Sequence, residues 1–272
     1  MRVHQMSTRI RIVGKSSGGS AVDSASYISR TVLTSEVTGE TYYPKYHEDL
    51  VYSDIFLPAN APESFHDRST LWNSVERIEK ASDAQLARYI KADLPNDWSY
   101  DLAIEVMSDF VKKTFVDQGM CADVAIHDSV NDEGQRNLHC HIMLTMRPLK
   151  ENGEWGAKCH KEYILDENGN KIKTAKGNYK SRKVDAVDWN SRGKASEWRK
   201  ALADEINRVN DENKIAVKWE NRSFKEQGIE REPEVHLGSA ASALERKGIK
   251  TERGNINRAI SARNSIILFA EK

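Results

Sequence analysis

Alternation of apolar and polar residues predicts that the chain begins with a β-strand over residues 3–13. The loop GKSSGGS interrupts this pattern, and apolar residues then recur every three to four positions. That spacing predicts an amphipathic helix that Ser20 caps and that runs to about Val32. Tyr27 falls at the border of its buried face, so we expect a fixed ring with an accessible hydroxyl. The residues expected in the core are Ala21, Ala25, Ile28 and Val32.

The rest of the chain mixes strand-like and helical patterns. Amphipathic helices are expected near residues 68–82, with Leu71, Val75 and Ile78 facing inward, from Ser99 to a stop at Gly119, and around Trp198 and Leu202. Strands are expected over residues 51–57, 85–94, 121–127 and 138–146, with a polar loop over 128–137. Because the order lacks strict βαβ alternation, the predicted fold class is α+β, an antiparallel β-sheet with flanking helices.

The run from Leu138 to Thr145 carries two histidines on one face of a predicted strand. His139 and His141 are two residues apart, and His127 points away from the core side of the preceding strand. If these strands pair, the three imidazoles form a cluster that leaves coordination positions open for water or a phosphate oxygen. Imidazole favours Mn, Fe, Ni, Cu or Zn over Mg, so the spacing leaves the ion undecided. The remaining histidines are expected at the surface or hydrogen-bonded in the core: His4, His47, His66, His160 and His236.

The composition changes this picture only when it is divided by region. The 272 residues hold 41 Lys and Arg against 41 Asp and Glu, and 39% of them are hydrophobic, which suffices for a packed core. Residues 61–140 carry 8 basic against 15 acidic side chains, whereas residues 141–200 carry 14 against 8. The zero net charge is therefore a cancellation, and it does not exclude a nucleic-acid partner.

Two classes of protein are excluded by the sequence. No apolar run approaches the roughly 18 to 20 residues of a membrane span, and arginines occupy the part of the amino terminus where a signal peptide would be apolar. We therefore expect a cytoplasmic protein. Cys121, Cys140 and Cys159 have no C-x-x-C spacing, so neither a disulfide framework nor a cysteine-rich zinc site is indicated.

The most basic part of the chain lies within residues 155–189, which we call the basic segment. Cations can neutralise phosphates while aromatic rings stack on bases, so the segment fits a single strand of nucleic acid. A solvated hairpin is the alternative, which charge alone slightly favours. The cations expected to bind DNA are Lys158, Lys161, Arg182 and Lys183, and the interleaved aromatic residues are Trp155, Tyr163, Tyr179 and Trp189.

Five stretches resemble the MobA/MobL-type mobilisation relaxases of the HUH endonuclease superfamily. They are GGSAVDSASYISR (18–30), SDIFLPANAPESFHDRSTLWNSVE (53–76), ADVAIHD (122–128), NLHCHIMLTMRPLKENGEWGAK (137–158) and EREPEVHLGSAASALERKGIKTERGNINR (230–258). The resemblance implies a metal-dependent nickase of the bacterial cytoplasm that acts on single-stranded DNA at a transfer origin. It also implies accessory mobilisation proteins and a type IV secretion coupling protein as partners. We expect an HUH catalytic core over residues 1–150, and a basic DNA-clamping segment with a C-terminal helical part over residues 151–272.

Carried over residue by residue, the resemblance implies that His127, His139 and His141 bind a divalent metal ion. It implies Mn or Mg in use, and a three-histidine site also admits Ni, Zn or Co. Tyr27 would be the nucleophile that forms a 5′-phosphotyrosine link. Three cations are expected nearer the scissile phosphate than the basic segment: Lys15, Arg30 and Arg147.

One strand departs from the family's pattern. Family members usually carry a glutamate where Tyr89 stands, and some carry a second where Lys91 stands. A carboxylate there would brace a ligand imidazole or assist the nucleophile, so Glu79, Asp93 and the hydroxyl of Tyr89 are the candidate substitutes. The departure keeps open a second hypothesis, an origin-binding DNA module without nicking activity. A cupin-like metal hydrolase is the third hypothesis.

Overall fold

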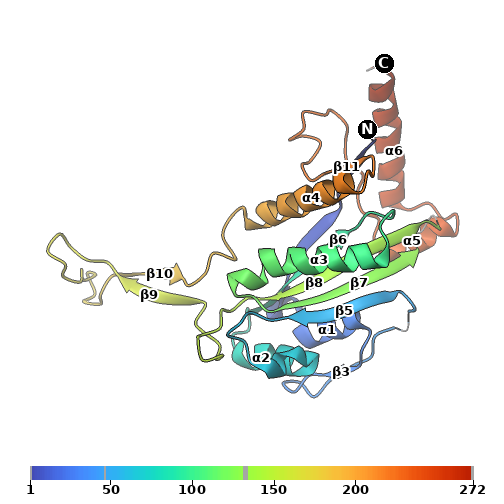
Figure 1. The fold of residues 1–272 in the computed structure, drawn as a ribbon. Helices are drawn as coiled ribbons and strands as arrows, with labels where there is room; N and C mark the ends of the chain where they lie inside the picture. Colours follow the sequence, from blue (N-terminus) through green and yellow to red (C-terminus); the bar gives the residue numbers. More distant parts are fainter. Residues whose placement is uncertain (1, 46, 131–133, 271–272) are drawn as a thin grey trace.

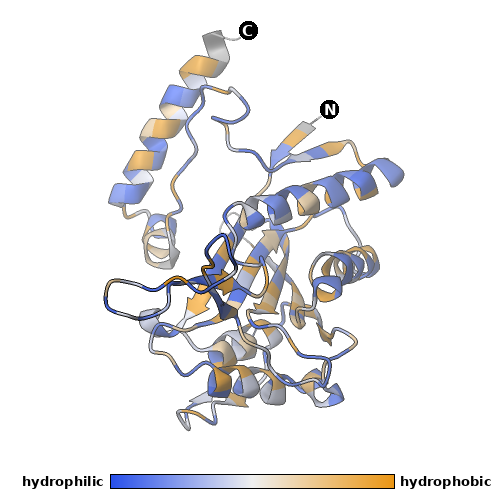
Figure 2. Cartoon of the chain, turned by 90° about the vertical axis from the view of Figure 1, so that its left-hand side faces the viewer, coloured by the Kyte–Doolittle hydropathy of each residue, from blue (hydrophilic) through white to orange (hydrophobic). Residues whose placement is uncertain are grey.

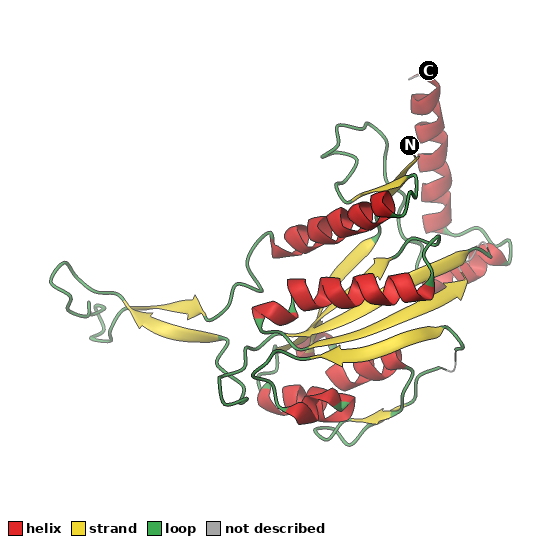
Figure 3. Cartoon of the chain, in the orientation of Figure 1, coloured by secondary structure: helices red, strands yellow, loops and turns green. Residues whose placement is uncertain are grey.

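The computed structural model describes residues 2–45, 47–130 and 134–270. Its centre is a five-stranded sheet whose neighbouring strands are all antiparallel, with helices on both faces (Figures 1 and 3). The α+β prediction is confirmed, and this open sheet is not the barrel of a cupin. In order across the sheet, the strands are β2 (Thr8–Gly14), β6 (Gln85–Asp93), β8 (Arg136–Thr145), β7 (Ala122–Val130) and β5 (Leu50–Phe56).

Period-two alternation divides the side chains of the sheet between two hydrophobic cores. On one face, Ile126 and Ile142 pack in a core with residues of α3 (Tyr100–Thr114) and α4 (Lys194–Glu212). On the other face, Ala125 and Met143 pack with residues of α1 (Ala21–Ser29) and α2 (Arg68–Ile78). The predicted faces of β7 and β8 are therefore confirmed. The histidines lie on the second face, directly beyond Ala125 and Met143 along these strands.

Serine side chains begin two of the helices, as the sequence predicts. Ser20 accepts a hydrogen bond from the backbone N–H of Asp23, and Ser99 accepts one from that of Leu102. Two predicted helix ends were too long. α1 ends at Ser29 because Arg30 takes the left-handed conformation (φ 57°), which leaves Val32 55% exposed. α2 ends at Ile78, which is 37% exposed and does not face the core.

The strand predicted over residues 3–13 is two strands, because the backbone changes partners between Met6 and Ser7. β1 (Arg2–Gln5) pairs in parallel with β11 (Val217–Glu220), whereas β2 pairs with β6. The N–H of Met6 still bonds to Glu220, and the carbonyl of Ser7 already accepts from Asp93. This exchange ties β11, which lies more than 200 residues away in the sequence, to the first strand.

The predicted polar loop over residues 128–137 is also shorter in the structure. β7 continues to Val130 and β8 begins at Arg136, and residues 131–133 lie outside the described part. The polar side chains at these ends of β7 and β8 are compatible with strands because they pair with one another across the two strands. For example, Arg136 donates to Asp128 over 2.8 Å.

The remaining elements surround this centre. The β9–β10 hairpin projects away from the sheet (Figures 1 and 3). α6 carries hydrophilic and hydrophobic residues along its length (Figure 2). Within the described residues, no helix combines the length and apolar character needed to cross a membrane. The elements are β3 (Leu33–Thr34), β4 (Thr41–Tyr42), β9 (Cys159–Tyr163), β10 (Ser181–Asp185), α5 (Ser239–Arg246), α6 (Glu252–Ala270), and the short 3₁₀ helices η1 (Lys15–Ser17), η2 (Glu63–His66) and η3 (Val116–Gln118).

Candidate functional site

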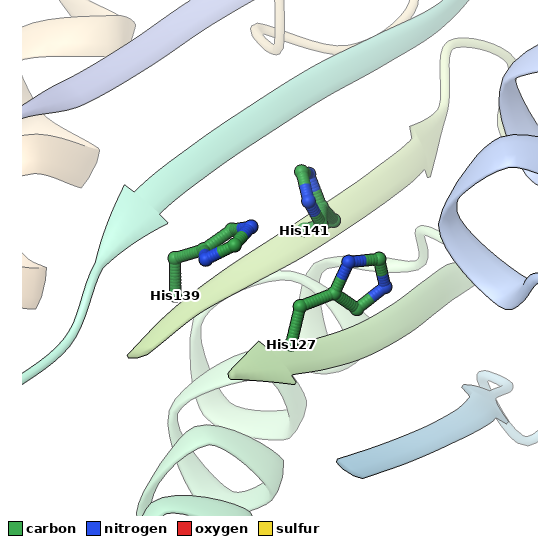
Figure 4. Close-up of side chains that lie close together, drawn as sticks. All are labelled: His127, His139 and His141. Carbon is green, nitrogen blue, oxygen red and sulfur yellow. The ribbon is translucent and has the colours of Figure 1, made fainter. Parts of the chain in front are cut away.

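Three imidazoles stand on the same side of the adjacent strands β7 and β8 (Figure 4). His127 and His139 are directly opposite each other in the strand register, and His141 lies two residues further along β8. The ring centroids are 4.6 to 5.5 Å apart, and one ligand atom from each ring lies within 4.8 Å of the others. All three side chains are buried. The sequence-predicted cluster is therefore present.

Backbone carbonyls fix the orientation of two of these rings. The Nε2–H of His127 donates to the carbonyl oxygen of Ile28 over 2.7 Å, and the Nδ1–H of His139 donates to that of Asn137 over 2.8 Å. A neutral imidazole that donates from one nitrogen keeps a lone pair on the other. His139 therefore keeps Nε2 able to bind a cation, whereas the lone pair on Nδ1 of His127 accepts a hydrogen bond of 3.2 Å from Arg30, which a bound cation would replace.

The third ring, His141, has an unused nitrogen. Its Nδ1 lies 2.6 Å from the hydroxyl of Tyr89, whereas its Nε2 is buried and has no hydrogen-bond partner in the described part of the chain. Burial lowers the pKa of all three histidines, and for His139 the charge of Lys91 helps to lower it to about 4. Neutral imidazoles and an orphaned buried nitrogen fit a bound divalent cation.

These lowered pKa values predict that the metal-free protein loses stability in acid. The unfolded chain binds protons at histidine near pH 6.5, but the folded chain holds His139 neutral down to about pH 4, so the free energy of unfolding falls as the pH drops through this window. We expect a loss of about 2 kcal/mol from His139 between about pH 6.5 and about pH 5. Urea unfolding in chelator measures it. A His139→Gln variant with the same pH dependence would contradict the assignment.

Tyr27 lies on α1 with its ring beside the cluster. The ring meets His141 edge-on at a centroid distance of 5.9 Å, and the side chain is 49% exposed. The position of α1 is set at its N-terminus by Glu76 of α2. One carboxylate oxygen of Glu76 accepts from Ser20 Oγ (2.6 Å) and from the backbone N–H groups of Ala21 (2.8 Å) and Val22 (3.2 Å). A buried carboxylate at a helix N-terminus satisfies free N–H groups and complements the helix dipole.

Arg30 holds the other end of α1. Its guanidinium donates to both carboxylate oxygens of Asp49 (3.0 and 2.8 Å), to the carbonyl of Tyr27 (2.7 Å) and to Nδ1 of His127 (3.2 Å). It also lies over the ring of Tyr27, 4.7 Å from the centroid. Arg30 therefore connects the tyrosine, a histidine and the start of β5.

Comparison with known proteins places this chain in a family. The sequence model of the MobA/MobL family matches residues 19–247, which include Tyr27 and all three histidines. The chain belongs to the MobA/MobL family.

The names of similar curated proteins refer to conjugal transfer and to mobilization. The chain is 34% identical to the conjugal transfer protein TraA of Agrobacterium fabrum, over 87% of this chain and 21% of that protein. It is 30% identical to the probable mobilization protein MobA of Bifidobacterium longum, over 94% of this chain and 47% of that protein. The chain thus spans a fifth to a half of the length of these relatives.

A solved structure shares the fold. It comes from a study titled "Molecular Basis of Vancomycin Resistance Transfer in Staphylococcus aureus" and superposes with a TM-score of 0.66 at 27% identity. The match covers 81% of this chain and all of the other.

At the position where other MobA/MobL proteins are expected to carry a glutamate, Tyr89 contacts His141. The Tyr89 side chain is buried, and the guanidinium of Arg11 lies 4.3 Å from the centre of its ring. Glu79, another candidate substitute, lies elsewhere. Its carboxylate pairs with Arg147 and Lys158 at the opposite end of the sheet from the histidines.

Removal of the Tyr89 hydroxyl should weaken metal binding. In a Tyr89→Phe variant, Nδ1 of His141 loses its partner and the ring loses its fixed orientation. Loss of such a contact typically lowers metal affinity 10- to 100-fold. Calorimetric titration with Mn²⁺ measures this, with Tyr163→Phe on the hairpin as the control. Equal affinity in the two variants would contradict a role of Tyr89 at the metal site.

Of the three cations expected nearer the scissile phosphate than the basic segment, only Arg30 lies beside the histidines of this MobA/MobL chain. Lys15 follows the end of β2 that pairs with Gln85, and Arg147 follows the end of β8 that pairs with Ala87. The histidines lie near the other ends of these strands, so Lys15 and Arg147 are not beside the cluster, and their role in DNA binding stays a prediction. Arg147, Lys158 and Lys183 instead line a separate cavity of about 470 Å³.

The basic segment includes the projecting hairpin. Two of its four predicted base-stacking residues, Trp155 and Trp189, pack against the body of the protein instead. Trp155 stacks on Phe65 at 5.4 Å, and Trp189 is 4% exposed within the core beside α3 and α4, so neither is free to stack on a base. Tyr163 and Tyr179 are 42% and 50% exposed. Lys161 is exposed on β9, and Arg182 of β10 forms an ion pair with Glu162.

Arg9, Arg11 and Lys91 are residues of the site that the sequence pattern did not identify. In the structure they stand on the histidine face, where Arg9 pairs with Lys91, and Lys91 pairs with His141, across three adjacent strands. The alternation of residues 3–13 already puts Arg9 and Arg11 on one side. The alternation does not show which strand lies beside these residues, so it could not place Lys91 next to Arg9.

Proposed function

We propose that this protein is a DNA relaxase of the HUH class that nicks one strand at a transfer origin. The observation that carries the proposal is the half-exposed ring of Tyr27 beside His141, at the edge of a buried three-histidine cluster. The family and its DNA-transfer relatives supply the substrate class. Accessory mobilisation proteins and a type IV secretion coupling protein belong to the same proposal.

The chemical step is a transesterification. The hydroxyl oxygen of Tyr27 forms a bond to phosphorus, the bond to the 3′ oxygen breaks, the tyrosyl proton leaves to solvent, and the 3′ oxygen takes up a proton. The products are a 5′-phosphotyrosine and a 3′ hydroxyl. His127, His139 and His141 would hold a divalent cation, which would polarise the phosphate and offset the charge that develops on it.

The other residues of the site position these groups. Arg30 holds the end of α1 and the ring of Tyr27, and the hydroxyl of Tyr89 holds His141. Lys91 and Arg11 add positive charge on the same face, which favours approach of a phosphate.

A labelled single-stranded origin oligonucleotide tests this proposal. With Mn²⁺, the wild-type protein should yield a covalent protein–DNA adduct that resists denaturation, and chelator should abolish it. Hydrolysed product without attached protein would contradict tyrosine attack.

A second candidate function is an origin-binding module that does not nick. The specific observation in its favour is that a tyrosine, not a carboxylate, contacts Nδ1 of His141. Near neutral pH a tyrosine cannot serve as a carboxylate base, and burial raises the pKa of Tyr89 further. Binding that persists in chelator, without an adduct under Mn²⁺, Mg²⁺, Ni²⁺, Co²⁺ or Zn²⁺, would support this function.

A further inference from the structure

A cavity of about 270 Å³ lies on the histidine face beside the cluster. It is lined by Ser7, Arg9, Lys91, Asp93 and His236. Lys91 and Asp93 pair with His141 and His139 in the strand register, so the cavity begins one strand away from the histidines. Neighbouring strands are about 5 Å apart, which places Arg9, two strands away, about 10 Å from His141. Drug-sized ligands occupy pockets of roughly 300 to 1,000 Å³, so this one suits a single group of a longer ligand.

The cavity carries more positive than negative charge, because Arg9 and Lys91 share it with a single carboxylate, Asp93, whose charge acts on Lys91 from beyond ion-pairing distance. Within the described residues, no acidic group lies within ion-pairing distance of Arg9 or Lys91, and Asp93 is the one carboxylate in the lining. Lys91 is also partly buried. A partly buried cation that forms no close ion pair costs free energy, which an incoming anion recovers.

His236 reaches the cavity from the segment between β11 and α5. Its Nδ1 accepts a hydrogen bond from the N–H of Gly238 over 3.1 Å, so the proton of the neutral ring is on Nε2, which can donate. This contact makes His236 a donor in the lining, and its exposed, hydrogen-bonded side chain agrees with the sequence prediction of a surface or hydrogen-bonded residue.

The helix α6 holds this segment in place. Arg253 donates to the carbonyls of His236 (3.2 Å) and Leu237 (3.1 Å), and Asn257 exchanges two hydrogen bonds of 2.8 Å with the backbone of Val235. These contacts join the two halves of the stretch EREPEVHLGSAASALERKGIKTERGNINR, to which the proposed chemistry assigns no role. The stretch therefore contributes to the lining of the cavity through His236.

We propose that Arg9, Lys91 and His236 form a subsite for a phosphodiester group that neighbours the scissile phosphate on the same single strand. The proposal rests on the proposed relaxase function for the identity of the ligand. Ser7 adds a hydroxyl that can donate, and Asp93 limits the net charge of the cavity. The subsite binds the strand through its backbone, so it contributes affinity and position but reads no base.

Fluorescence anisotropy of labelled single-stranded (dT)20 tests the subsite in the Tyr27→Phe background with chelator, where no adduct forms. We expect the double variant Arg9→Gln/Lys91→Gln to bind about tenfold more weakly or worse. Its plot of log affinity against log salt should be shallower by about 0.7 for each lost phosphate contact. His236→Ala should weaken binding less. The matched control, Lys200→Gln/Arg208→Gln on the exposed side of α4, should leave both quantities unchanged.

The outcomes separate this proposal from the relaxase proposal. An unchanged affinity and salt slope in the Arg9 and Lys91 double variant overturns the subsite, as does a Tyr27→Phe protein that does not bind the oligonucleotide. Normal binding by a wild-type protein that never forms an adduct overturns only the nicking chemistry. Thermal unfolding of each variant shows that the fold is retained, and Mn²⁺ titration shows that the histidine cluster is retained.

Discussion

Tyr27→Phe should abolish the covalent DNA adduct and leave DNA binding intact. The ring keeps its contacts with Arg30 and His141, so the variant loses only the oxygen that would attack phosphorus. Loss of a nucleophile typically costs a factor of 10³ or more in rate. The side chain is half exposed, so we expect the free energy of unfolding to change by less than about 0.5 kcal/mol. Denaturing gels of the labelled oligonucleotide with Mn²⁺ measure the adduct.

Tyr43→Phe is the matched control for this result. Tyr43 is 77% exposed, and its hydroxyl has no part in the proposed chemistry. The control should form the adduct at the wild-type rate. If Tyr27→Phe protein forms as much adduct as wild type, the attacking group is a different side chain, and mass spectrometry of the linked peptide would locate it.

His141→Gln should remove metal binding more completely than any change outside the cluster. His141 has the shortest centroid distances to both other histidines, 4.6 and 4.8 Å, and its free Nε2 is the orphaned nitrogen of the site. Without it, two imidazoles remain, and we expect the affinity for Mn²⁺ to fall by a factor of about 100 or more. The adduct should disappear at low metal concentration and return in part when Mn²⁺ is raised.

His66→Gln is the control, because this half-exposed histidine lies on η2, outside the cluster. Glutamine preserves most of the volume of His141 and can still bond to Tyr89, which limits the loss of stability. Calorimetric titration compares the two variants directly. Equal Mn²⁺ affinity in both would show that the cation binds elsewhere.

The sequence could predict what depends on local periodicity. Alternation alone put His139 and His141 on one face and Ile142 on the other, and the caps at Ser20 and Ser99 follow from side-chain chemistry within one turn. Strand partners are set by tertiary packing, which one strand's alternation does not encode. The place of Arg9 next to Lys91 therefore could not be derived from the sequence, nor could the distance of Arg147 from the histidines.

Some residue types also have two roles between which composition cannot decide. Trp155 and Trp189 occur among lysines, which indicates a DNA-binding surface, yet their rings contribute to the interior beside Phe65 and Trp198. Arg30 was expected to bind DNA, but its guanidinium is occupied by Asp49 and the end of α1. For Trp155 and Arg30, the deciding contacts with Phe65 and Asp49 come from other parts of the fold.

The attachment of α1 at both ends has a consequence for strand rejoining. Glu76 holds its first turn and Arg30 its last, so Tyr27 sits on a short span that cannot swing outward without breaking buried contacts at one end. In the proposed reaction, the 5′ end of the cut strand becomes part of that span. The immobility of the helix would then keep the new ester beside the 3′ hydroxyl. The rate of strand rejoining would depend on the anchoring of the helix as much as on the affinity for the DNA.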